Sequence, residues 1–352
     1  MRSRGLFRWG ACAGCAGIGP ILGPVERGPS HGALGPVFLG GTGRCGTHVV
    51  ASLAASSGRY AQVPAELRLH ISPDGLPAFV EGRHSRRRLL RGLRTHWWSH
   101  RPEWDRAERR GAYRITPRGR YLLALARLAA APPRADRTTL CRRFVSSLLD
   151  PLATEARAWV EKSPDNCAAA GFLARLYPRL RVIHVIRDGR DVACSFMRVP
   201  WAPDDFADAL AVWERGMLDA HLGTLEVPAE SIHRLLLEDL VRRDREHSYR
   251  SLLGFLGIPD EPRVRSHFER ELTPGRARIG RWRSDLPRAE HARADALYAE
   301  ALGRLAAAGV TPLPPLAQDD PAEGRGGAGE AGESPPLDPW AAMTAKVEPG
   351  PP

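Results

Sequence analysis

The sequence predicts a three-layer α/β fold in which helices cover both faces of a central, mainly parallel sheet. Short apolar segments, typical of buried strands, alternate with helical segments of about 10–15 residues over residues 36–66 and 158–312. A glycine-rich turn joins the first strand to a helix, and strands spaced by helices of this length indicate right-handed βαβ units. The composition, with 43% hydrophobic and 26% charged residues, is that of a globular protein. No apolar run is long enough to predict a membrane-spanning helix.

The elements follow in order along the chain. Residues 36–39 predict the first strand, 47–57 a helix, and the residues just before position 66 a second short strand. After a long helical stretch, a helix near 167–177 precedes the apolar strand 182–186, and another helix starts at Arg190. The remaining elements are a helix at 206–222, a strand at 232–237 and helices at 248–256 and 289–308. Strands separated by helices of this length predict a parallel sheet.

We expect one large domain over residues 36–312. Residues 1–35 are rich in glycine without periodicity, and residues 313–352 are rich in proline, glycine and acids, so both segments are expected to be disordered. Residues 67–157 predict a helical, arginine-rich insertion. Between Glu81 and Arg120 there are 13 arginines and four acidic residues, a net charge of +9.

The whole chain has a formal net charge of +11, which favours anionic partners. Of its 51 basic residues, 49 are arginine, so part of this charge reflects a general preference for arginine. The six cysteines are scattered, and only Cys12 and Cys15 form a CxxC pair, which no second pair completes into a zinc site. We therefore expect no metal site and a reducing compartment, the cytoplasm.

A first phosphate site is predicted where the first strand enters its glycine-rich turn. The segment Gly41-Thr-Gly-Arg44-Cys45-Gly46-Thr47-His48 directs backbone N–H groups and a helix N-terminus at one point, and Arg44 adds a guanidinium. A nucleoside-triphosphatase loop would place a lysine and a hydroxyl residue after its last glycine. Here Thr47 and His48 occupy those positions, so the site disfavours ATP with Mg²⁺.

A second anion site is predicted after the strand 182–186. That strand delivers Arg187 to its carboxyl end, and Ser195 follows on the next helix, so both side chains can meet one phosphate. We expect Arg190 and Asp191 to cap that helix or to pair with each other. Lys162 is the only lysine within residues 36–312, which suggests a site that needs a compact ammonium group.

These segments resemble two motifs of the sulfotransferases that use 3′-phosphoadenosine 5′-phosphosulfate (PAPS). The nearest relatives by this resemblance are the tyrosylprotein sulfotransferases and similar bacterial enzymes. It implies a P-loop-like fold in which residues 44–48 hold the 5′-phosphosulfate and Arg187 and Ser195 hold the 3′-phosphate. The segment Arg278–Pro287 resembles the family's final loop, in which Arg281 would close over the nucleotide.

The resemblance also assigns catalytic roles. Glu66, 22 residues after Arg44, would be the base that deprotonates the acceptor hydroxyl. Lys162 and Arg44 would stabilise the charge that develops during transfer. His48 and His70 are alternative bases. The product would be 3′-phosphoadenosine 5′-phosphate (PAP).

Other functions stay open at the level of sequence. The arginine-rich insertion, with Trp97, Trp98 and Trp104 as stacking surfaces, fits a nucleic-acid-binding protein, although two ordered phosphate motifs have no purpose there. A nucleotide or small-molecule kinase would need the missing P-loop lysine. The acceptor is not identified: a carbohydrate, a lipid, a phenol and a peptide tyrosine all fit, and the basic insertion favours an anionic one. A homo-oligomer is compatible with the sequence.

Overall fold

The computed structural model describes residues 34–99, 111–153 and 156–316. The expected disordered leader (1–35) and tail (313–352) lie almost entirely outside these residues, as do Cys12, Cys15 and Trp104, so those expectations stay predictions. Within the described residues, no helix is long and apolar enough to cross a membrane.

The sheet of the described residues has five strands, all parallel, in the spatial order β2-β3-β1-β4-β5. The strands are β1 (Val37–Gly41), β2 (Tyr60–Gln62), β3 (Ala158–Lys162), β4 (Arg181–Ile186) and β5 (Ile232–Leu236). Leu39 of β1 is in register with Lys162 on one side and Ile183 on the other. The predicted parallel sheet is confirmed, with β1 at its centre.

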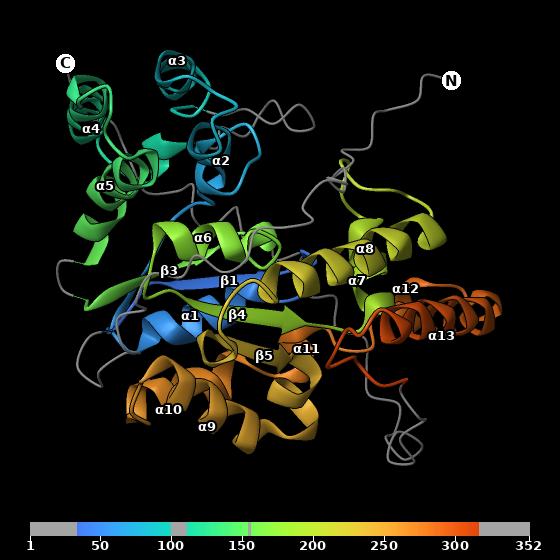
Figure 1. The fold of residues 1–352 in the computed structure, drawn as a ribbon. Coiled ribbons are helices and arrows are strands. Elements are labelled where there is room, and N and C mark those ends of the chain that lie inside the picture. Colours follow the sequence, from blue (N-terminus) through green and yellow to red (C-terminus); the bar gives the residue numbers. More distant parts are fainter. Residues whose placement is uncertain (1–33, 100–110, 154–155, 317–352) are drawn as a thin grey trace, which may run out of the picture. The chain divides into compact units, whose positions relative to one another are not determined.

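Helices occupy both faces of the sheet and form the insertion beside it (Figure 1). They are α1 (Thr47–Ser56), α2 (Leu76–Val80), α3 (Arg86–Thr95), α4 (Arg118–Ala130), α5 (Arg137–Leu149), α6 (Ala170–Leu176), α7 (Gly189–Phe196), α8 (Phe206–Thr224), α9 (Arg245–Leu256), α10 (Pro262–Glu271), α11 (Pro274–Ala277), α12 (Trp282–Asp285) and α13 (His291–Ala307). Residues 67–157 are thus largely helical, as the sequence predicts.

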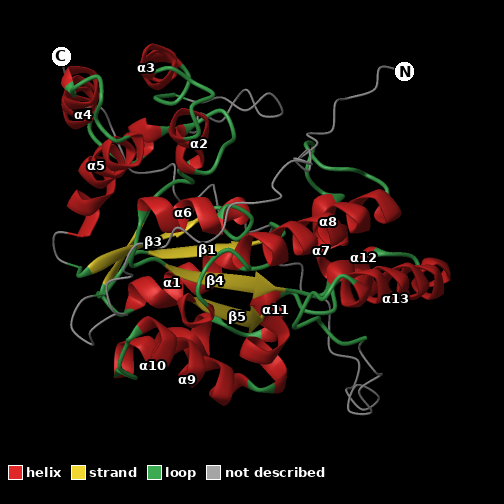
Figure 2. Cartoon of the chain, in the orientation of Figure 1, coloured by secondary structure: helices red, strands yellow, loops and turns green. Residues whose placement is uncertain are grey.

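Helices cover both faces of the sheet (Figure 2), and three apolar clusters of the described residues hold the layers together. Two clusters lie on opposite faces of β1, and the third joins α7, α8 and α13 at the end of β4. Val37 and Leu39 of β1 pack with residues of α1, α9 and α10. Phe38, between them in sequence, points to the other face and packs with α6 and with the insertion. This alternation is the two-residue period of a β-strand, and it explains why β1 is apolar throughout.

The sequence did not predict β3 as an element of its own, because a carboxylate interrupts its apolar pattern. Glu161 lies in the middle of Ala158–Lys162 and is nevertheless fully buried. A charged residue is rarely buried without partners, so the segment looks like a loop to any argument based on hydrophobic periodicity. The partners of Glu161 come from distant parts of the chain.

The connections that follow β1 and its neighbour β3 run on opposite faces of the sheet. α1 follows β1 on one face, whereas α6 follows β3 on the other. In open parallel sheets, a ligand crevice forms at the carboxyl ends of the strands where the connections diverge in this way. The fold therefore places its expected ligand site at Gly41 and the loop that follows.

Candidate functional site

The end of β1 and the loop after it depend on glycines that adopt left-handed conformations or approach neighbouring backbone closely, and on one left-handed arginine. Gly46, the N-cap of α1, has a φ of 97°, in the left-handed region that favours glycine. A Cβ on Gly40 would lie 2.5 Å from the backbone nitrogen of Cys167, which is too close for any side chain. Arg44 itself is left-handed, with a φ of 56°. The loop therefore approaches its neighbours closely while presenting Arg44 outward.

The structure brings the two predicted phosphate motifs together. Nε of Arg44 donates a hydrogen bond to Oγ of Ser195 on α7 (2.9 Å), across 151 residues of sequence. Nη1 of Arg187, directly after β4, donates to the carbonyl oxygen of Arg44 (3.2 Å). Arg44, expected at the 5′-phosphosulfate, and Arg187 and Ser195, expected at the 3′-phosphate, therefore lie in a single site.

Arg187 is buried, and one edge of its guanidinium is left unsatisfied. Its Nη2 donates to Asp191 (3.1 Å) and to the carbonyl oxygen of Arg278 (2.7 Å). Its Nε is buried without a hydrogen-bond partner. Because a buried unsatisfied donor is costly, this atom indicates that an anionic acceptor belongs beside it.

The expectation for Arg190 and Asp191 was wrong. The two side chains do not pair, and Asp188 caps α7 instead by accepting the backbone N–H of Arg190 (2.8 Å). Asp191 accepts the backbone N–H groups of Gly280 (2.9 Å) and Trp282 (3.1 Å). Asp191 therefore joins the Arg187 motif to the final loop, a contact that sequence spacing could not reveal.

Arg190 has a structural role of its own. Its side chain is buried, donates to both oxygens of Asp188 and pairs with Asp295 at the start of α13. The guanidinium also lies over the rings of Trp282 and Tyr298, at 4.5 and 4.6 Å from their centroids. These contacts fasten α13 and the final loop to α7.

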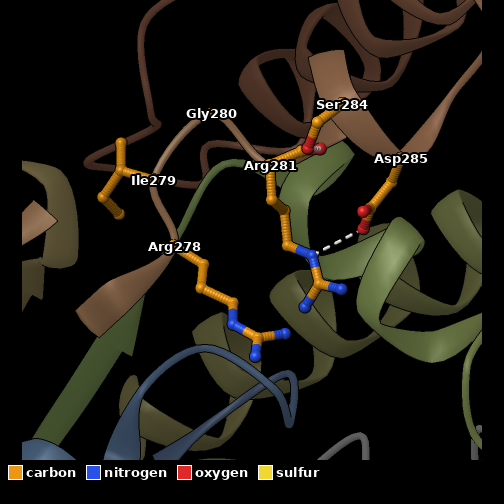
Figure 3. Close-up of a pocket in the computed structure, with 6 residues that line it drawn as sticks. All are labelled: Arg278, Ile279, Gly280, Arg281, Ser284 and Asp285. Atoms are coloured by element: carbon orange, nitrogen blue, oxygen red, sulfur yellow. Dashed lines mark hydrogen bonds and ion pairs between the residues drawn. The ribbon is translucent and has the colours of Figure 1, made fainter. Parts of the chain in front are cut away.

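The final loop supplies an open pocket of about 370 Å³, whose charged lining is Arg278, Arg281 and Asp285. Figure 3 shows the guanidinium groups of Arg278 and Arg281 on the same side of this loop. Nε of Arg281 donates to Asp285 (2.7 Å), which leaves the rest of its guanidinium for a ligand. Burial, followed by the charges of Arg281, Arg187 and Arg278, lowers the pKa of Arg44. Four cations that repel one another this way are complementary to a polyanion.

Lys162 lies at the carboxyl end of β3, beside β1 and its loop. Two effects lower the pKa of His48: the partial burial of its side chain, which is the larger, and the positive charge of Lys162 nearby. His48 therefore stays neutral near neutral pH and remains a second candidate base.

The Cys45 side chain is buried in the core, so any contribution of Cys45 to a phosphate must come from its backbone. Thr47 opens α1, where helix N–H groups are unpaired.

Glu66 lies four residues beyond β2, in the connection to a short 3-10 turn, Arg68–His70. Its Oε2 is 3.4 Å from Nη1 of Arg68, whose Nη2 donates to Asp165 (2.6 Å). Glu66 also lines a small cavity of about 10 Å³ with Trp97 of the insertion. The insertion thus reaches the candidate base.

Glu161 connects the segments that carry Glu66 and Lys162. Its carboxylate accepts the backbone N–H of Leu67 (3.0 Å), the hydroxyl of Ser163 (2.6 Å) and the amide of Asn166 (2.6 Å). Burial acts to raise the pKa of Glu161, but His70 and these hydrogen bonds outweigh it and lower the pKa. Sequence reasoning missed this residue, although it directly precedes Lys162.

His70 is fully buried against this network. Its Nε2 lies 3.8 Å from Glu161, and its Nδ1 lies 3.3 Å from the hydroxyl of Tyr177. A base must reach the hydroxyl that it deprotonates. The structure therefore does not support His70 as the alternative base.

Residues 36–262 match a family model described as the sulfotransferase family. This range contains β1 to β5 and more than half of the chain. The chain belongs to the sulfotransferase family. Membership supports a transferase that moves sulfuryl groups, and it agrees with the expectation drawn from the two loop motifs.

Several solved structures are similar to this sulfotransferase family member. The sulfotransferase domain of the Synechococcus PCC 7002 olefin synthase is 22% identical over 78% of this chain and 97% of its own, with a TM-score of 0.43. Mouse sulfotransferase SULT7A1, solved in complex with PAP, is 11% identical over 80% of this chain and 88% of its own, with a TM-score of 0.41. A comparison with curated protein sequences found no significant match.

Proposed function

We propose that this protein transfers the sulfuryl group of PAPS to a hydroxyl group of an acceptor and releases PAP. The observation that carries the proposal is the convergence of Arg44, Arg187, Arg278 and Arg281 at the carboxyl end of β1. The buried, unpartnered Nε of Arg187 fits this ligand, because a 3′-phosphate supplies the missing acceptor. PAPS is the co-substrate, and its role here rests on family membership and on this fit.

The roles of the residues follow from their positions. Arg187 and Ser195 would bind the 3′-phosphate, and residues 44–48 would bind the 5′-phosphosulfate through the helix N-terminus and the Arg44 side chain. Arg281, in the final loop, would cover the nucleotide. An anion bound between the four guanidinium groups offsets their mutual repulsion, and this would contribute to its affinity.

Glu66 would accept the proton of the acceptor hydroxyl as that oxygen bonds to sulfur. The bond between sulfur and the bridging oxygen of PAP breaks, and the electron pair stays on PAP. Lys162 and Arg44 would stabilise the negative charge on that oxygen. Positioning supplies much of the catalysis in such an in-line displacement, which suits a site built on rigid strand ends.

The structure weakens the alternative of nucleic-acid binding by base stacking. Trp97 is 8% exposed, and Trp98 packs against Tyr121 with ring centroids 4.8 Å apart. Neither ring forms the open surface that base stacking needs. A kinase remains disfavoured by the residues after Gly46, because Thr47 and His48 replace the P-loop lysine and hydroxyl residue.

The test is the thermal unfolding of the protein with PAP and, separately, with ATP and Mg²⁺. Because a ligand of the native state stabilises it by mass action, PAP at about 100 times its Kd should add about 2.7 kcal/mol and raise the Tm by several degrees. ATP with Mg²⁺ should give a much smaller shift. Equal shifts with both nucleotides would contradict the proposal.

Arg187→Ala sharpens the test, because it removes a charge-assisted hydrogen bond to one phosphate only. We expect PAP binding to weaken about tenfold or more, and binding of adenosine 5′-phosphosulfate, which has no 3′-phosphate, to stay nearly unchanged. Ser195→Ala is a milder second variant that keeps the pair between Arg187 and Asp191. Equal weakening for both ligands would make Arg187 a structural residue.

A further inference from the structure

The outward arginines of α3 and α4 concentrate positive charge at one end of the insertion. They are exposed, and none forms an ion pair within the described chain: Arg87, Arg88, Arg91, Arg94, Arg118, Arg120 and Arg127. No acidic residue occurs in the described segments 82–99 and 111–135. Such an uncompensated field attracts anions.

The general preference for arginine in this sequence does not by itself explain that field. On other elements, some exposed arginines have acidic partners: Arg250 pairs with Glu246 (2.6 Å), Arg270 with Glu271 (2.8 Å) and Arg304 with Glu214 (2.7 Å). Others, such as Arg179, Arg215 and Arg288, are exposed without an ion pair among the described residues. Neither α3 nor α4 contains an acidic residue, so no carboxylate of their own can pair with the arginines of these two helices. This excess of positive charge marks α3 and α4 as a surface for an anionic partner.

The outward face of α4 is also apolar along its middle. Leu122 and Leu123 are 50% and 51% exposed, although a solvated helix normally presents polar residues there. Ala126 and Ala129 continue this strip at helical spacing from Leu122 and are exposed too. At 100° per residue, Arg118 flanks the strip on one side and Arg120 and Arg127 on the other.

Helices α3 and α4 pack together as one unit. The hydroxyl of Tyr121 donates to the carbonyl oxygen of Leu93 (2.8 Å), and Figure 1 shows the two helices side by side at the end of the insertion away from the sheet. The exposed residues of the two neighbouring helices form the insertion face, which comprises the arginines of α3 and the arginine-flanked apolar strip of α4.

We propose that the insertion face binds the surface of a membrane that contains anionic lipids. An interfacial helix buries a shallow apolar strip among acyl chains while flanking arginines reach the headgroups. Arginines near such a surface are attracted by anionic headgroups. A nucleic acid would satisfy the arginines but would gain little from Leu122 and Leu123. This proposal is independent of the proposed sulfotransferase activity.

The test is co-sedimentation of the full chain with vesicles of phosphatidylcholine alone and of phosphatidylcholine mixed with phosphatidylserine. We expect binding to the mixed vesicles only. Arg118→Gln/Arg120→Gln/Arg127→Gln should weaken vesicle binding about a hundredfold, since each of the three arginines contributes a similar share of the attraction to anionic headgroups. Leu122→Ser/Leu123→Ser should weaken it about tenfold, since apolar burial is lost.

Matched controls lie on other elements of the same chain. Leu222→Ser/Leu225→Ser replaces two leucines that are 51% and 63% exposed at the end of α8, and Arg250→Gln/Arg270→Gln/Arg304→Gln replaces three paired arginines. Both controls should bind like the unaltered protein. Binding that is absent, or that ignores phosphatidylserine, overturns the proposal. Loss in the arginine variant alone overturns the proposed burial of the apolar strip and leaves only electrostatic attraction to the headgroups.

Discussion

Arg44 has a strained backbone conformation that two other residues of the site hold in place. Its left-handed conformation costs a non-glycine residue about 1–2 kcal/mol. Its contacts offset that cost, because its Nε bonds to Ser195 and its carbonyl oxygen accepts a hydrogen bond from Arg187. A strained residue held in place by two other site residues is typical of a position kept for function.

Glu66→Gln separates chemistry from binding at the residue scale. The amide keeps the shape of the side chain but cannot accept the proton of the acceptor, so turnover should fall about 10²- to 10⁴-fold. PAP affinity, measured by calorimetry, should stay nearly unchanged. Turnover is measured as PAP release from PAPS, with the first active acceptor from a panel of phenols, sugars and tyrosine peptides.

The control for this change is Glu81→Gln, on the surface of the insertion, where the carboxylate pairs with Arg83 (2.8 Å). That variant should keep normal turnover. If Glu66→Gln also keeps it, Glu66 is not the base, and His48 becomes the residue to test, since burial and Lys162 keep it neutral.

At the scale of elements, one carboxylate fastens the final loop to α7. Asp191 accepts the N–H groups of Gly280 and Trp282 and pairs with Arg187. Asp191→Asn replaces one acceptor oxygen by a donor, so the side chain can no longer accept hydrogen bonds from both N–H groups and Arg187. We expect faster hydrogen exchange at Gly280 and Trp282, and PAP affinity reduced about tenfold through the loss of positioned Arg187 and Arg281.

Asp239→Asn is the matched control for that loop. Asp239 follows β5 closely and pairs with Arg243 at 2.7 Å on the surface. It should leave both exchange and affinity unchanged. Unaltered hydrogen exchange in Asp191→Asn would show that the loop is held by other contacts, such as the ring of Trp282 beneath Arg190.

The sequence predicted those elements whose signals are local. β1, α1, β4, α8 and β5 are found within a few residues of their expected bounds, because apolar runs and glycine turns mark them. β3 and the partners of Asp191 and Glu161 were missed. Their contacts join residues separated by up to about a hundred positions, and one sequence carries no record of such pairing. Arg278 was overlooked beside Arg281 because only the folded loop shows that both side chains face one pocket.

At the scale of the whole molecule, Glu238 makes stability depend on pH. It accepts the backbone N–H of Asp188 (2.9 Å), but its other oxygen is buried without a partner, and burial raises its pKa from 4.5 to about 7. The folded state then binds the proton more tightly than the unfolded state. The free energy of unfolding therefore falls as pH rises from about 4.5 to about 7, and stays lower above that range.

Glu238→Gln should remove this dependence, because the amide resembles the protonated carboxyl group. We expect the variant to be more stable than the unaltered protein near pH 8, by on the order of 1–3 kcal/mol, and about equally stable near pH 4.5. Thermal unfolding at both pH values measures the difference. The exposed Glu261, paired with Arg263, gives the control Glu261→Gln. A constant difference between variant and parent at both pH values would contradict the assignment to Glu238.

The arrangement of Arg44, Ser195 and Trp282 has a consequence for how the protein is made. Arg44 and Ser195 meet in the site, and the contact of Trp282 with Asp191 anchors the final loop to it, yet the ribosome adds these residues in widely separated stretches of synthesis. Contacts of such long range form slowly, since the intervening chain must first be closed into loops. A nascent chain therefore has no complete nucleotide site until residue 282 has emerged. Nucleotide added during translation can stabilise only chains that have passed that point.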